Sequence, residues 1–433
     1  MGMSMKRCIG VLLILCLVAG AVCCGSGGDA QPFLEPEDRV GTAVVVDGAE
    51  SPIADTGGSG ADSLTPGAVG QETEVRGAGS AAAPQAAEAE AETREEPAFG
   101  GGPPPVPEPE MQEVVEDALP PVFGLIDAHA DTITRALLRD QGLFNNSLHV
   151  DFERLFEYGA PVQVFALWCA DRYVANAFDY TNSLIDFFES EVAKHSDIIE
   201  IALSLEDLER NARNNRISAI LSIEGGEALM GDINNLDHFY NRGVRILSLT
   251  WNRENELGYG QATESVKGLK PLGVECIKRM EELGIILDIS HLNEAGFWDA
   301  HRVSTRPYMA SHSNAYALTP HNRNLTDEQI VAMVDRGGVI GLALYPLFLS
   351  PENGADMGDI MAHISHFISL GAGGNLGFGS DFDGFDTMPR GITDISSFTS
   401  LEERIAAEFG EEVSHKIMSG NFYEFFIRYS AVT

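Results

Sequence analysis

Residues 125–131 read Leu-Ile-Asp-Ala-His-Ala-Asp, an apolar run that leads into a polar cluster. The apolar residues predict a buried strand whose far end carries His129 and Asp131. Side chains two positions apart on a strand point to the same face, so this imidazole and this carboxylate would lie side by side. Such a pair suits a divalent metal ion of hard or borderline character. Taken alone, the motif is equally compatible with a solvated strand end.

Seven more apolar runs of strand length follow along the chain. They cover residues 161–168, 217–224, 244–251, 285–291, 308–313, 338–345 and 376–381. Segments with helical periodicity lie between several of them, at 182–195, 272–283, 327–336 and 357–370. Near-continuous apolar strands that alternate with helices predict a parallel sheet covered on both faces. We therefore expect residues 122–433 to form one α/β domain, an eight-stranded (β/α)8 TIM-like barrel.

Nearly every predicted strand ends in a residue type that is common in catalytic or metal-binding sites. These residues are His129, Asp131, Glu224, Trp251, Asn252, His291, His312, Tyr345, Asp381 and Asp383. Active sites of such barrels form at the carboxyl ends of the strands, so the pattern predicts one site built from many strands. Three histidines, one glutamate and at least two aspartates exceed the needs of one catalytic ion and suit two. Two glycines after Glu224 allow substrate or backbone to approach closely, and we assign Glu224 the bridge between the ions.

The remaining histidines do not share this placement. Seven fall in helical or loop contexts and are predicted to lie at the surface: His149, His195, His238, His301, His363, His366 and His415. The role of His321, in a loop close to the site in sequence, stays open. Only Cys169 and Cys276 lie beyond the first 24 residues, and we expect two buried thiols rather than a disulfide bridge.

Residues 1–24 are typical of an export signal. Lys6 and Arg7 precede an apolar run at 9–22, which is too short for a comfortable membrane span. A cysteine directly after such a run is typical of bacterial lipoproteins, so we favour lipid attachment at Cys23 or Cys24. A plainly cleaved signal and a retained anchor are the alternatives. The predicted location is therefore the cell envelope as a lipoprotein, or the periplasm or extracellular space.

Residues 25–121 contain 20 acidic and 3 basic residues among many Ala, Gly, Pro and Ser residues. This self-repelling composition with few large apolar side chains predicts a disordered acidic tether. The whole chain of 433 residues carries a formal net charge of −37. Nucleic acid is therefore excluded as an expected partner, because phosphate binding needs basic patches.

The motifs of residues 122–433 jointly resemble the membrane (renal) dipeptidase family of zinc peptidases. They are Asp-Ala-His-Ala-Asp at 127–131, Ser-Ile-Glu-Gly-Gly at 222–226, Leu-Asp-Ile-Ser-His at 287–291, Ser-His-Ser-Asn-Ala-Tyr at 311–316, His-Asn-Arg-Asn at 321–324 and Gly-Ser-Asp-Phe-Asp-Gly at 379–384. They occur in the family's order. The resemblance implies a (β/α)8 barrel that holds two zinc ions (Zn²⁺) and hydrolyses dipeptides, and it is compatible with a homodimer.

The resemblance also implies roles for individual residues. The implied metal ligands are His129, Asp131, Glu224, His291 and His312, with Glu224 as the bridge. Asp381 falls at the family's acid/base carboxylate. Arg323 falls where the family binds the substrate's C-terminal carboxylate, and a bidentate guanidinium suits that role. Tyr345 would line the same pocket, and Trp251 stands where characterised mammalian members carry a substrate-contacting histidine. Trp251 offers one N–H donor but carries no proton charge.

The sequence thus predicts a metallo-dipeptidase in which a hydroxide that bridges two zinc ions attacks the peptide carbonyl. Two alternatives stay open. One is another binuclear metallohydrolase on the same barrel, of the lactonase, deaminase or phosphoester type. The other is an exported protein that binds without cutting. Against the first alternative, many such barrels carry a His-x-His motif on the first strand, whereas this chain carries His-x-Asp there. Against the second, a pure binding protein has no structural reason to gather five metal-type ligands.

Overall fold

The computed structural model describes residues 121–263, 266–351 and 354–432. In this part of the chain it contains nine strands: β1 (Ile126–Ala130), β2 (Val162–Trp168), β3 (Ile199–Ile201), β4 (Ile217–Glu224), β5 (Val244–Ser248), β6 (Ile286–Asp288), β7 (Met309–Ala310), β8 (Val339–Leu342) and β9 (Leu376–Phe378). The predicted export signal, the two candidate lipid-attachment cysteines and the acidic linker up to residue 120 lie outside the described residues. Among the described residues, no helix has both the length and the apolar character needed to cross a bilayer.

Eight of these strands form a closed parallel barrel, which confirms the predicted fold class. The hydrogen-bonded order is β2-β1-β9-β8-β7-β6-β5-β4, and β4 then pairs with β2 along seven residue pairs to close the circle. Because the strands run parallel, all their carboxyl ends meet at one rim of the barrel. The predicted strands were right in existence and order, although β6 and β7 are shorter than the apolar runs that contain them.

The short strand β3 is an addition that the sequence did not reveal. It pairs with the first three residues of β4, whereas β5 pairs with the later residues of β4. Its sequence, Ile-Glu-Ile, contains no apolar run, so the pattern of buried barrel strands does not extend to it. β3 therefore widens the amino end of the sheet and does not contribute to the rim where the ligand candidates lie.

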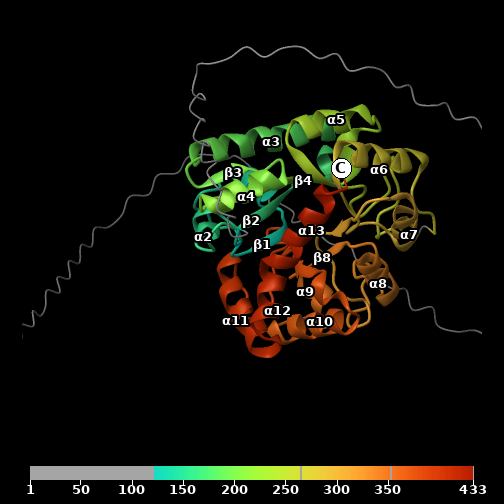
Figure 1. The fold of residues 1–433 in the computed structure, drawn as a ribbon. Coiled ribbons are helices and arrows are strands. Elements are labelled where there is room, and N and C mark those ends of the chain that lie inside the picture. The colour runs from blue at the N-terminus through green and yellow to red at the C-terminus, as the bar shows by residue number, and fades with distance from the viewer. Residues whose placement is uncertain (1–120, 264–265, 352–353, 433) are drawn as a thin grey trace, which may run out of the picture. The chain divides into compact units, whose positions relative to one another are not determined.

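Helices surround the barrel (Figure 1). They are α1 (Thr132–Leu138), α2 (Phe152–Phe156), α3 (Ala177–Lys194), α4 (Leu205–Arg213), α5 (Asn234–Asn241), α6 (Pro271–Leu283), α7 (Glu294–Val303), α8 (Asp327–Asp335), α9 (Pro346–Leu349), α10 (Met357–Ser369), α11 (Phe398–Phe409), α12 (Glu411–His415) and α13 (Asn421–Ser430), with short turns η1 (Asp171–Asn176), η2 (Gly226–Leu229), η3 (Ala372–Gly374), η4 (Ile395–Ser397) and η5 (Lys416–Gly420). Local sequence sets their ends. Pro271 begins α6 and Gly284 ends it, while Thr326 and Gln329 form a capping box at α8.

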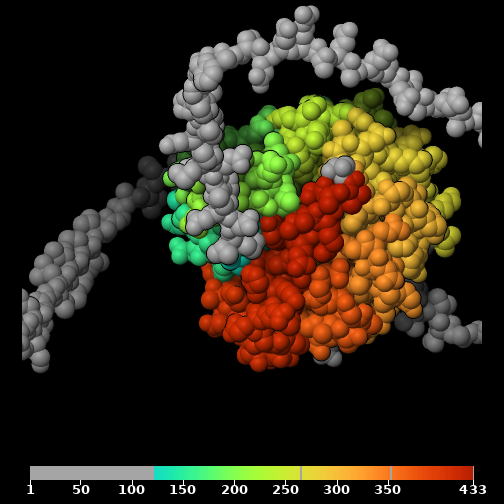
Figure 2. Space-filling model, in the orientation of Figure 1, coloured from blue at the N-terminus to red at the C-terminus, as the bar shows by residue number. Residues whose placement is uncertain are grey.

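The C-terminal helix α13 closes the amino end of the barrel. Its aromatic residues Phe422, Phe425 and Tyr429 pack against the apolar side chains that fill the barrel interior. The Tyr429 hydroxyl donates a hydrogen bond of 2.7 Å to the carbonyl oxygen of Ile285, just before β6. In Figure 2 this helix, coloured red, runs across the middle of the visible face. Among the described residues, α13 thus covers the amino end of the barrel, and the ligand candidates lie at the opposite rim, where the strands end.

Candidate metal centre

The five predicted metal ligands meet at the carboxyl rim of the barrel. His129 lies in β1, Asp131 is the first residue after β1, and Glu224 is the last residue of β4. The other two follow the short strands β6 and β7: they are His291 and His312. All five side chains are buried. The chain places them there because each apolar strand ends at this rim, and the five residues lie at or just after the strand ends.

Glu224 lies at the centre of this cluster, and its two carboxylate oxygens face different ligand candidates. Its Oε1 atom is 2.7 Å from Nε2 of His291 and 3.7 Å from Nε2 of His312. Its Oε2 atom is 3.5 Å from Nε2 of His129, which in turn is 3.6 Å from Oδ2 of Asp131. The two carboxylate oxygens thus serve different pairs of ligands, as a bridging carboxylate requires.

The donor atoms form two adjoining candidate metal positions. In the position at β1, donor atoms of His129, Asp131 and Glu224 all lie within 4.8 Å of one another, and the same holds for Glu224, His291 and His312 in the position at β6 and β7. Both ring nitrogens of His129 and Oδ1 of Asp131 are buried without a hydrogen-bond partner among the described residues. Buried polar atoms are normally paired, so these atoms fit metal ions as their partners.

Burial and crowding perturb the acidic groups of the cluster. Burial raises the pKa of Glu224 to about 7, and the charge of Asp131 adds to this rise. Burial also raises the pKa of Asp381 well above its usual range, although His129 and Arg323 oppose that rise. Three carboxyl groups in one buried space are unfavourable without cations nearby. The cluster is therefore electrostatically suited to divalent cations.

The three histidines respond to this environment in opposite directions. Burial lowers the pKa of His291 and of His312 well below its usual value, and the Arg323 charge acts in the same direction. For His129, burial alone would lower the pKa, but the carboxylates of Glu224 and Asp131 outweigh it and hold the pKa well above its usual value. A metal ion binds neutral imidazole, so His291 and His312 are already in the binding form near neutral pH.

Asp381 reaches the cluster from the loop after β9. Its carboxylate lies within 4.8 Å of donor atoms of His129 and His312. Its backbone has a φ of +61°, a left-handed conformation that is uncommon for residues other than glycine, and its N–H donates to the His129 carbonyl oxygen at 3.1 Å. A Cβ atom at Gly384 would collide with carboxylate oxygens of Asp381 and Asp131, so the next turn of the loop requires glycine.

Asp383 lies in the same loop but does not join the metal cluster. Its Oδ2 atom accepts a hydrogen bond of 2.6 Å from the Thr132 hydroxyl, and its Oδ1 accepts one of 2.8 Å from the His149 backbone N–H. The Nδ1 atom of His149 in turn accepts from the Asp383 N–H at 3.0 Å. Asp383 therefore attaches the Asp381 loop to neighbouring segments.

Arg323 is buried beside the position at β6 and β7. Its Nη2 atom is 3.3 Å from Nε2 of His291 and donates to the His312 carbonyl oxygen at 3.2 Å, whereas its Nη1 atom is buried with no partner among the described residues. Burial lowers its pKa to about 10, against the opposing charges of Asp381 and Glu224. Arg323 thus stays cationic near neutral pH and keeps a donor for an anionic ligand group.

Aromatic side chains lie on two sides of the cluster. The half-buried Trp251 ring is 6.3 Å from the His291 ring and 5.2 Å from the ring of Trp168, measured between centroids. On the other side, Tyr345 packs against Phe348 at 4.7 Å and Phe385 at 5.2 Å. Sequence reasoning included Trp251 and Tyr345 but missed Trp168. Its position as the last residue of β2, in register with Glu224, was the available indication.

The seven histidines expected at the surface differ in burial. His415 is exposed, His363 is completely buried, and the other five are half-buried: His149, His195, His238, His301 and His366. The predicted surface position of His363 was therefore wrong. His363 lies on the inner face of α10, where Nδ1 accepts from the Ala315 N–H at 3.2 Å and Nε2 donates to the Leu349 carbonyl oxygen at 3.0 Å. Cys169 and Cys276 are buried free thiols, as predicted.

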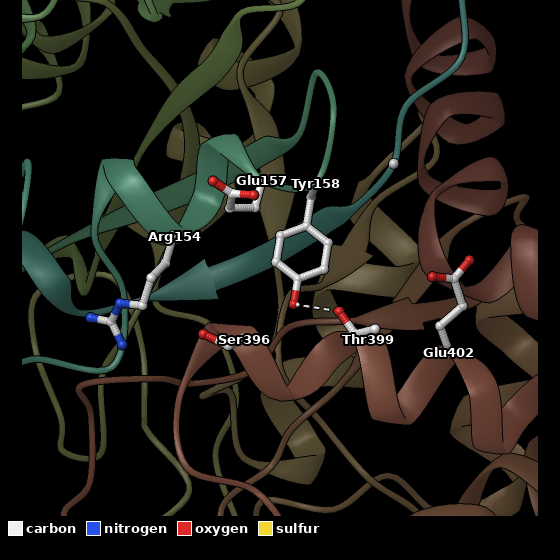
Figure 3. Close-up of a pocket in the computed structure, with 7 residues that line it drawn as sticks. Arg154, Glu157, Tyr158, Ser396, Thr399 and Glu402 are labelled. Atoms are coloured by element: carbon white, nitrogen blue, oxygen red, sulfur yellow. Dashed lines mark hydrogen bonds between the residues drawn. The ribbon is translucent and has the colours of Figure 1, made fainter. Parts of the chain in front are cut away.

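A surface hollow of about 360 Å³ lies at the amino end of β1 (Figure 3). It is lined by Gly124, Arg154, Glu157, Tyr158, Ser396, Thr399 and Glu402. The Tyr158 hydroxyl, central in this view, donates to the Ile395 carbonyl oxygen at 2.8 Å and lies 3.4 Å from the Thr399 hydroxyl. Gly124 precedes β1, whereas His129 lies toward its other end. The hollow is therefore separate from the metal centre.

Comparison with known proteins shows the family to which this chain belongs. A sequence profile described as "Membrane dipeptidase (Peptidase family M19)" matches residues 115–428. The uncharacterized dipeptidase C965.12 of Schizosaccharomyces pombe is 30% identical over 305 residues, which cover 64% of this chain and 73% of that protein.

Solved structures with this fold include two metallopeptidases. A metallo peptidase from Rhodobacter sphaeroides, liganded with a phosphinate mimic of the dipeptide L-Ala-D-Ala, superposes with a TM-score of 0.66 and 25% identity over 71% of this chain and 99% of that chain. The dipeptidase AC, a metallo peptidase of family M19, gives a TM-score of 0.66 and 27% identity over 71% of this chain and 98% of that chain. The chain therefore belongs to the membrane dipeptidase family, peptidase family M19, and is a metal-using peptide-bond hydrolase.

Proposed function

We propose that this protein is a binuclear zinc dipeptidase whose two ions share Glu224. The observation that carries the proposal is the division of the Glu224 carboxylate, with one oxygen toward His291 and the other toward His129. Imidazole nitrogen and carboxylate oxygen are the donors that zinc binds in catalytic sites. When bound, two zinc ions would polarise the peptide carbonyl and lower the pKa of a shared water toward neutrality, supplying the hydroxide nucleophile.

We assign proton transfer to Asp381. Its carboxylate adjoins His129 and His312, close to where the nucleophile and the scissile bond would lie. Burial raises its pKa well above the usual range, which brings a carboxyl group closer to the pH at which acid/base catalysts work best. Asp381 would take the proton from the attacking water and pass it to the leaving amine.

We assign recognition of the substrate's C-terminal carboxylate to Arg323. The guanidinium is fixed through Nη2 by the His312 carbonyl oxygen, and Nη1 has no partner among the described residues. A buried cation with an available N–H group favours an anion that it can bind with charge-assisted hydrogen bonds. Because Arg323 also lies 3.3 Å from His291, the bound carboxylate would sit close to the metal centre. The site would therefore prefer very short peptides with a free C-terminus.

The aromatic side chains would contact the two side chains of a dipeptide. Phe348 lies under the Arg323 guanidinium at 5.3 Å and packs against Tyr345, so these rings would border the C-terminal residue. Trp251 and Trp168, on the other side of the cluster, would border the N-terminal residue. The related Rhodobacter sphaeroides peptidase was solved with a mimic of L-Ala-D-Ala, and a D-residue at the second position is accordingly included in the proposed substrate class.

We further propose, from the sequence, that residues 1–24 direct export, that residues 25–121 form a spacer and that residues 122–433 are the catalytic domain. Lipid attachment at Cys23 or Cys24 would place the enzyme at the cell envelope. The positive residues and apolar run at the N-terminus support this proposal, as does the acidic composition that follows. Family membership is compatible with a homodimer.

The proposal is tested with the purified full-length protein. Hydrolysis of Ala-Ala dipeptides with an L- or D-residue at the second position is measured before chelation, after chelation and after zinc is restored. We expect cleavage to disappear with the metal and to return with zinc. Cleavage that persists in the fully metal-free protein would refute the zinc mechanism. Restored zinc binding with no cleavage of any dipeptide would refute the proposed substrate class.

A further inference from the structure

The two metal positions differ in how the protein holds their histidines. The position at β6 and β7 takes His291 and His312, and the position at β1 takes His129. A neutral imidazole ligates metal through one nitrogen, and a hydrogen bond at the other nitrogen fixes which one is available. The contacts of the second nitrogen therefore show how far each position is organised before any ion binds.

The His291 ring is oriented by a hydrogen bond to a side-chain amide. Its Nδ1 atom lies 3.0 Å from Oδ1 of Asn252, and the same oxygen accepts a hydrogen bond of 2.9 Å from the Gln261 side-chain amide. An amide oxygen only accepts hydrogen bonds, so Nδ1 of His291 carries the proton. Nε2 of His291 is thereby left as the nitrogen available to a metal ion, and it lies 2.7 Å from Oε1 of Glu224 and 3.0 Å from Nε2 of His312.

The His312 ring is oriented by a hydrogen bond to a hydroxyl group, and a carboxylate orients that hydroxyl group in turn. Its Nδ1 atom lies 2.7 Å from the Ser311 hydroxyl oxygen, and that hydroxyl donates to Oδ2 of Asp288 at 2.6 Å. A hydroxyl has one hydrogen, and Ser311 uses it on the carboxylate, so its oxygen accepts from Nδ1–H of His312. Nε2 of His312 is then the nitrogen available to a metal ion, and it lies 3.7 Å from Oε1 of Glu224.

Asp288 is held firmly in this arrangement. It is buried, and Oδ1 accepts from the N–H of Ser290 at 3.1 Å, the hydroxyl of Ser290 at 2.7 Å and the N–H of Ser311 at 2.9 Å. It thereby ties the end of β6 to the end of β7. The orientation of the His312 ring follows from backbone positions on two adjacent strands.

His129 has no comparable contact. Both of its ring nitrogens lack a hydrogen-bond partner among the described residues. Its ring instead stacks on the His312 ring, with centroids 3.9 Å apart and planes 33° apart. Stacking limits the tilt of the ring but does not select the nitrogen that carries the proton.

We propose that the two metal positions load in sequence: the position of Glu224, His291 and His312 binds its ion first and more tightly, and the position of His129, Asp131 and Glu224 binds second. Asn252, Ser311 and Asp288 act as positioning residues for the tighter ion. A preorganised site loses less conformational freedom when the ion binds, which is the physical basis of the difference. This inference rests on the binuclear centre of the proposed function.

Native mass spectrometry of the metal-free full-length protein tests the loading order directly. Zinc is added in steps, and the relative amounts of protein with no, one and two bound ions are measured at each step. We expect the one-ion species to accumulate before the two-ion species appears. His129→Ala should retain the tight ion, whereas His291→Ala should lose it. A one-ion species that never accumulates, or a tight ion that survives in His291→Ala but not in His129→Ala, would overturn the proposed order.

Two serines provide a matched test of the positioning residues. The Ser311 hydroxyl contacts a ring nitrogen of the ligand His312. The hydroxyl of Ser313, on the other side of His312 in the chain, is buried with no hydrogen-bond partner among the described residues. Ser311→Ala should lower the affinity for the more tightly bound zinc ion by about 10- to 100-fold, measured in competition with a chelator. A loss of this size is typical when such a contact is removed. Ser313→Ala should leave the affinity close to the parent value. Equal weakening in both variants would show that Ser311 acts only through general packing.

Circular dichroism of the metal-free variants checks that each is folded. If Ser311→Ala fails to fold, Asn252→Ala tests the same inference through His291, with Ser313→Ala again as its control. Two ions of equal affinity would refute sequential loading and leave the proposed dipeptidase intact. A protein that binds no zinc at all would refute both.

Discussion

Glu224 ends β4 and His291 follows β6, and these two strands are not neighbours in the barrel, yet Oε1 of Glu224 lies 2.7 Å from Nε2 of His291. The other oxygen of the same carboxylate faces His129, 3.5 Å away. This geometry joins the two metal positions through one side chain. Removal of one Glu224 oxygen should therefore affect the two ions together.

Glu224→Gln should reduce the zinc content from the proposed two ions per chain to one at most. A glutamine side chain has one oxygen and no charge, so it cannot serve two cations. Zinc per chain is measured by elemental analysis after removal of weakly bound metal. Glu227→Gln, three residues further along and outside the donor cluster, is the control and should keep both ions. Two tightly held ions in Glu224→Gln would contradict the bridging role.

Asp381→Asn should lower kcat by about 10²- to 10⁴-fold while zinc content stays at the parent value. Asparagine has the same shape, cannot take up the proton and tolerates the positive φ at this position. Steady-state hydrolysis and metal content are measured on the same preparation. Near-parent turnover would remove Asp381 from the proton transfer, and loss of zinc would make it a ligand instead.

Arg323→Lys should raise KM for dipeptides by about tenfold or more and change kcat less. The lysine keeps the charge but loses the planar pair of donors that a carboxylate binds, and a hydrogen bond to a charged group is worth about 1.5–3 kcal/mol. A C-terminally amidated dipeptide is the matched substrate. The parent enzyme should discriminate strongly against the amide, and the variant should discriminate less. If the parent cleaves both substrates equally, Arg323 does not recognise the carboxylate.

His363→Gln should make the protein less sensitive to acid. Burial lowers the pKa of His363 from 6.5 to about 4, so the folded state favours the neutral ring. The stability that this neutral ring contributes is present above pH 6.5 and is lost as the pH falls toward 4. Between pH 7 and pH 5 the loss amounts to about 2 kcal/mol.

The measurement is the change in urea unfolding midpoint between pH 7 and pH 5. The parent should lose more stability over this range than His363→Gln, whatever the variant's stability at pH 7. His415→Gln, which alters an exposed histidine, should behave as the parent does. An identical pH dependence in parent and His363→Gln would show that His363 is not the acid-sensitive group.

The barrel and the identity of the ligand candidates could be predicted because both follow from local sequence. Each barrel strand is an apolar run, and His129, Glu224 and Asp381 stand where such runs end. The strand β3 could not be found this way, because three residues of mixed polarity depend on pairing with β4 for their structure. Residues that follow a strand end are predictable, whereas residues defined by a contact across the fold are not.

Several buried residues illustrate the same limit. His363 lies on a helix, and its sequence context predicts a surface position. Its burial is explained by the positions of Ala315 and Leu349 in the fold. Asn252 and Ser311 stand beside conspicuous residues, but their contacts with ring nitrogens of His291 and His312 depend on side-chain orientation. Sequence spacing carries no information on that orientation.

Anomalous scattering at the zinc absorption edge, from crystals of the zinc-loaded protein, tests the central claim most directly. The account predicts two peaks at the carboxyl rim, one on each side of the Glu224 carboxylate, with His129 and Asp131 beside one peak and His291 and His312 beside the other. A single peak at saturating zinc, or two peaks that do not share Glu224, would contradict the bridged binuclear centre.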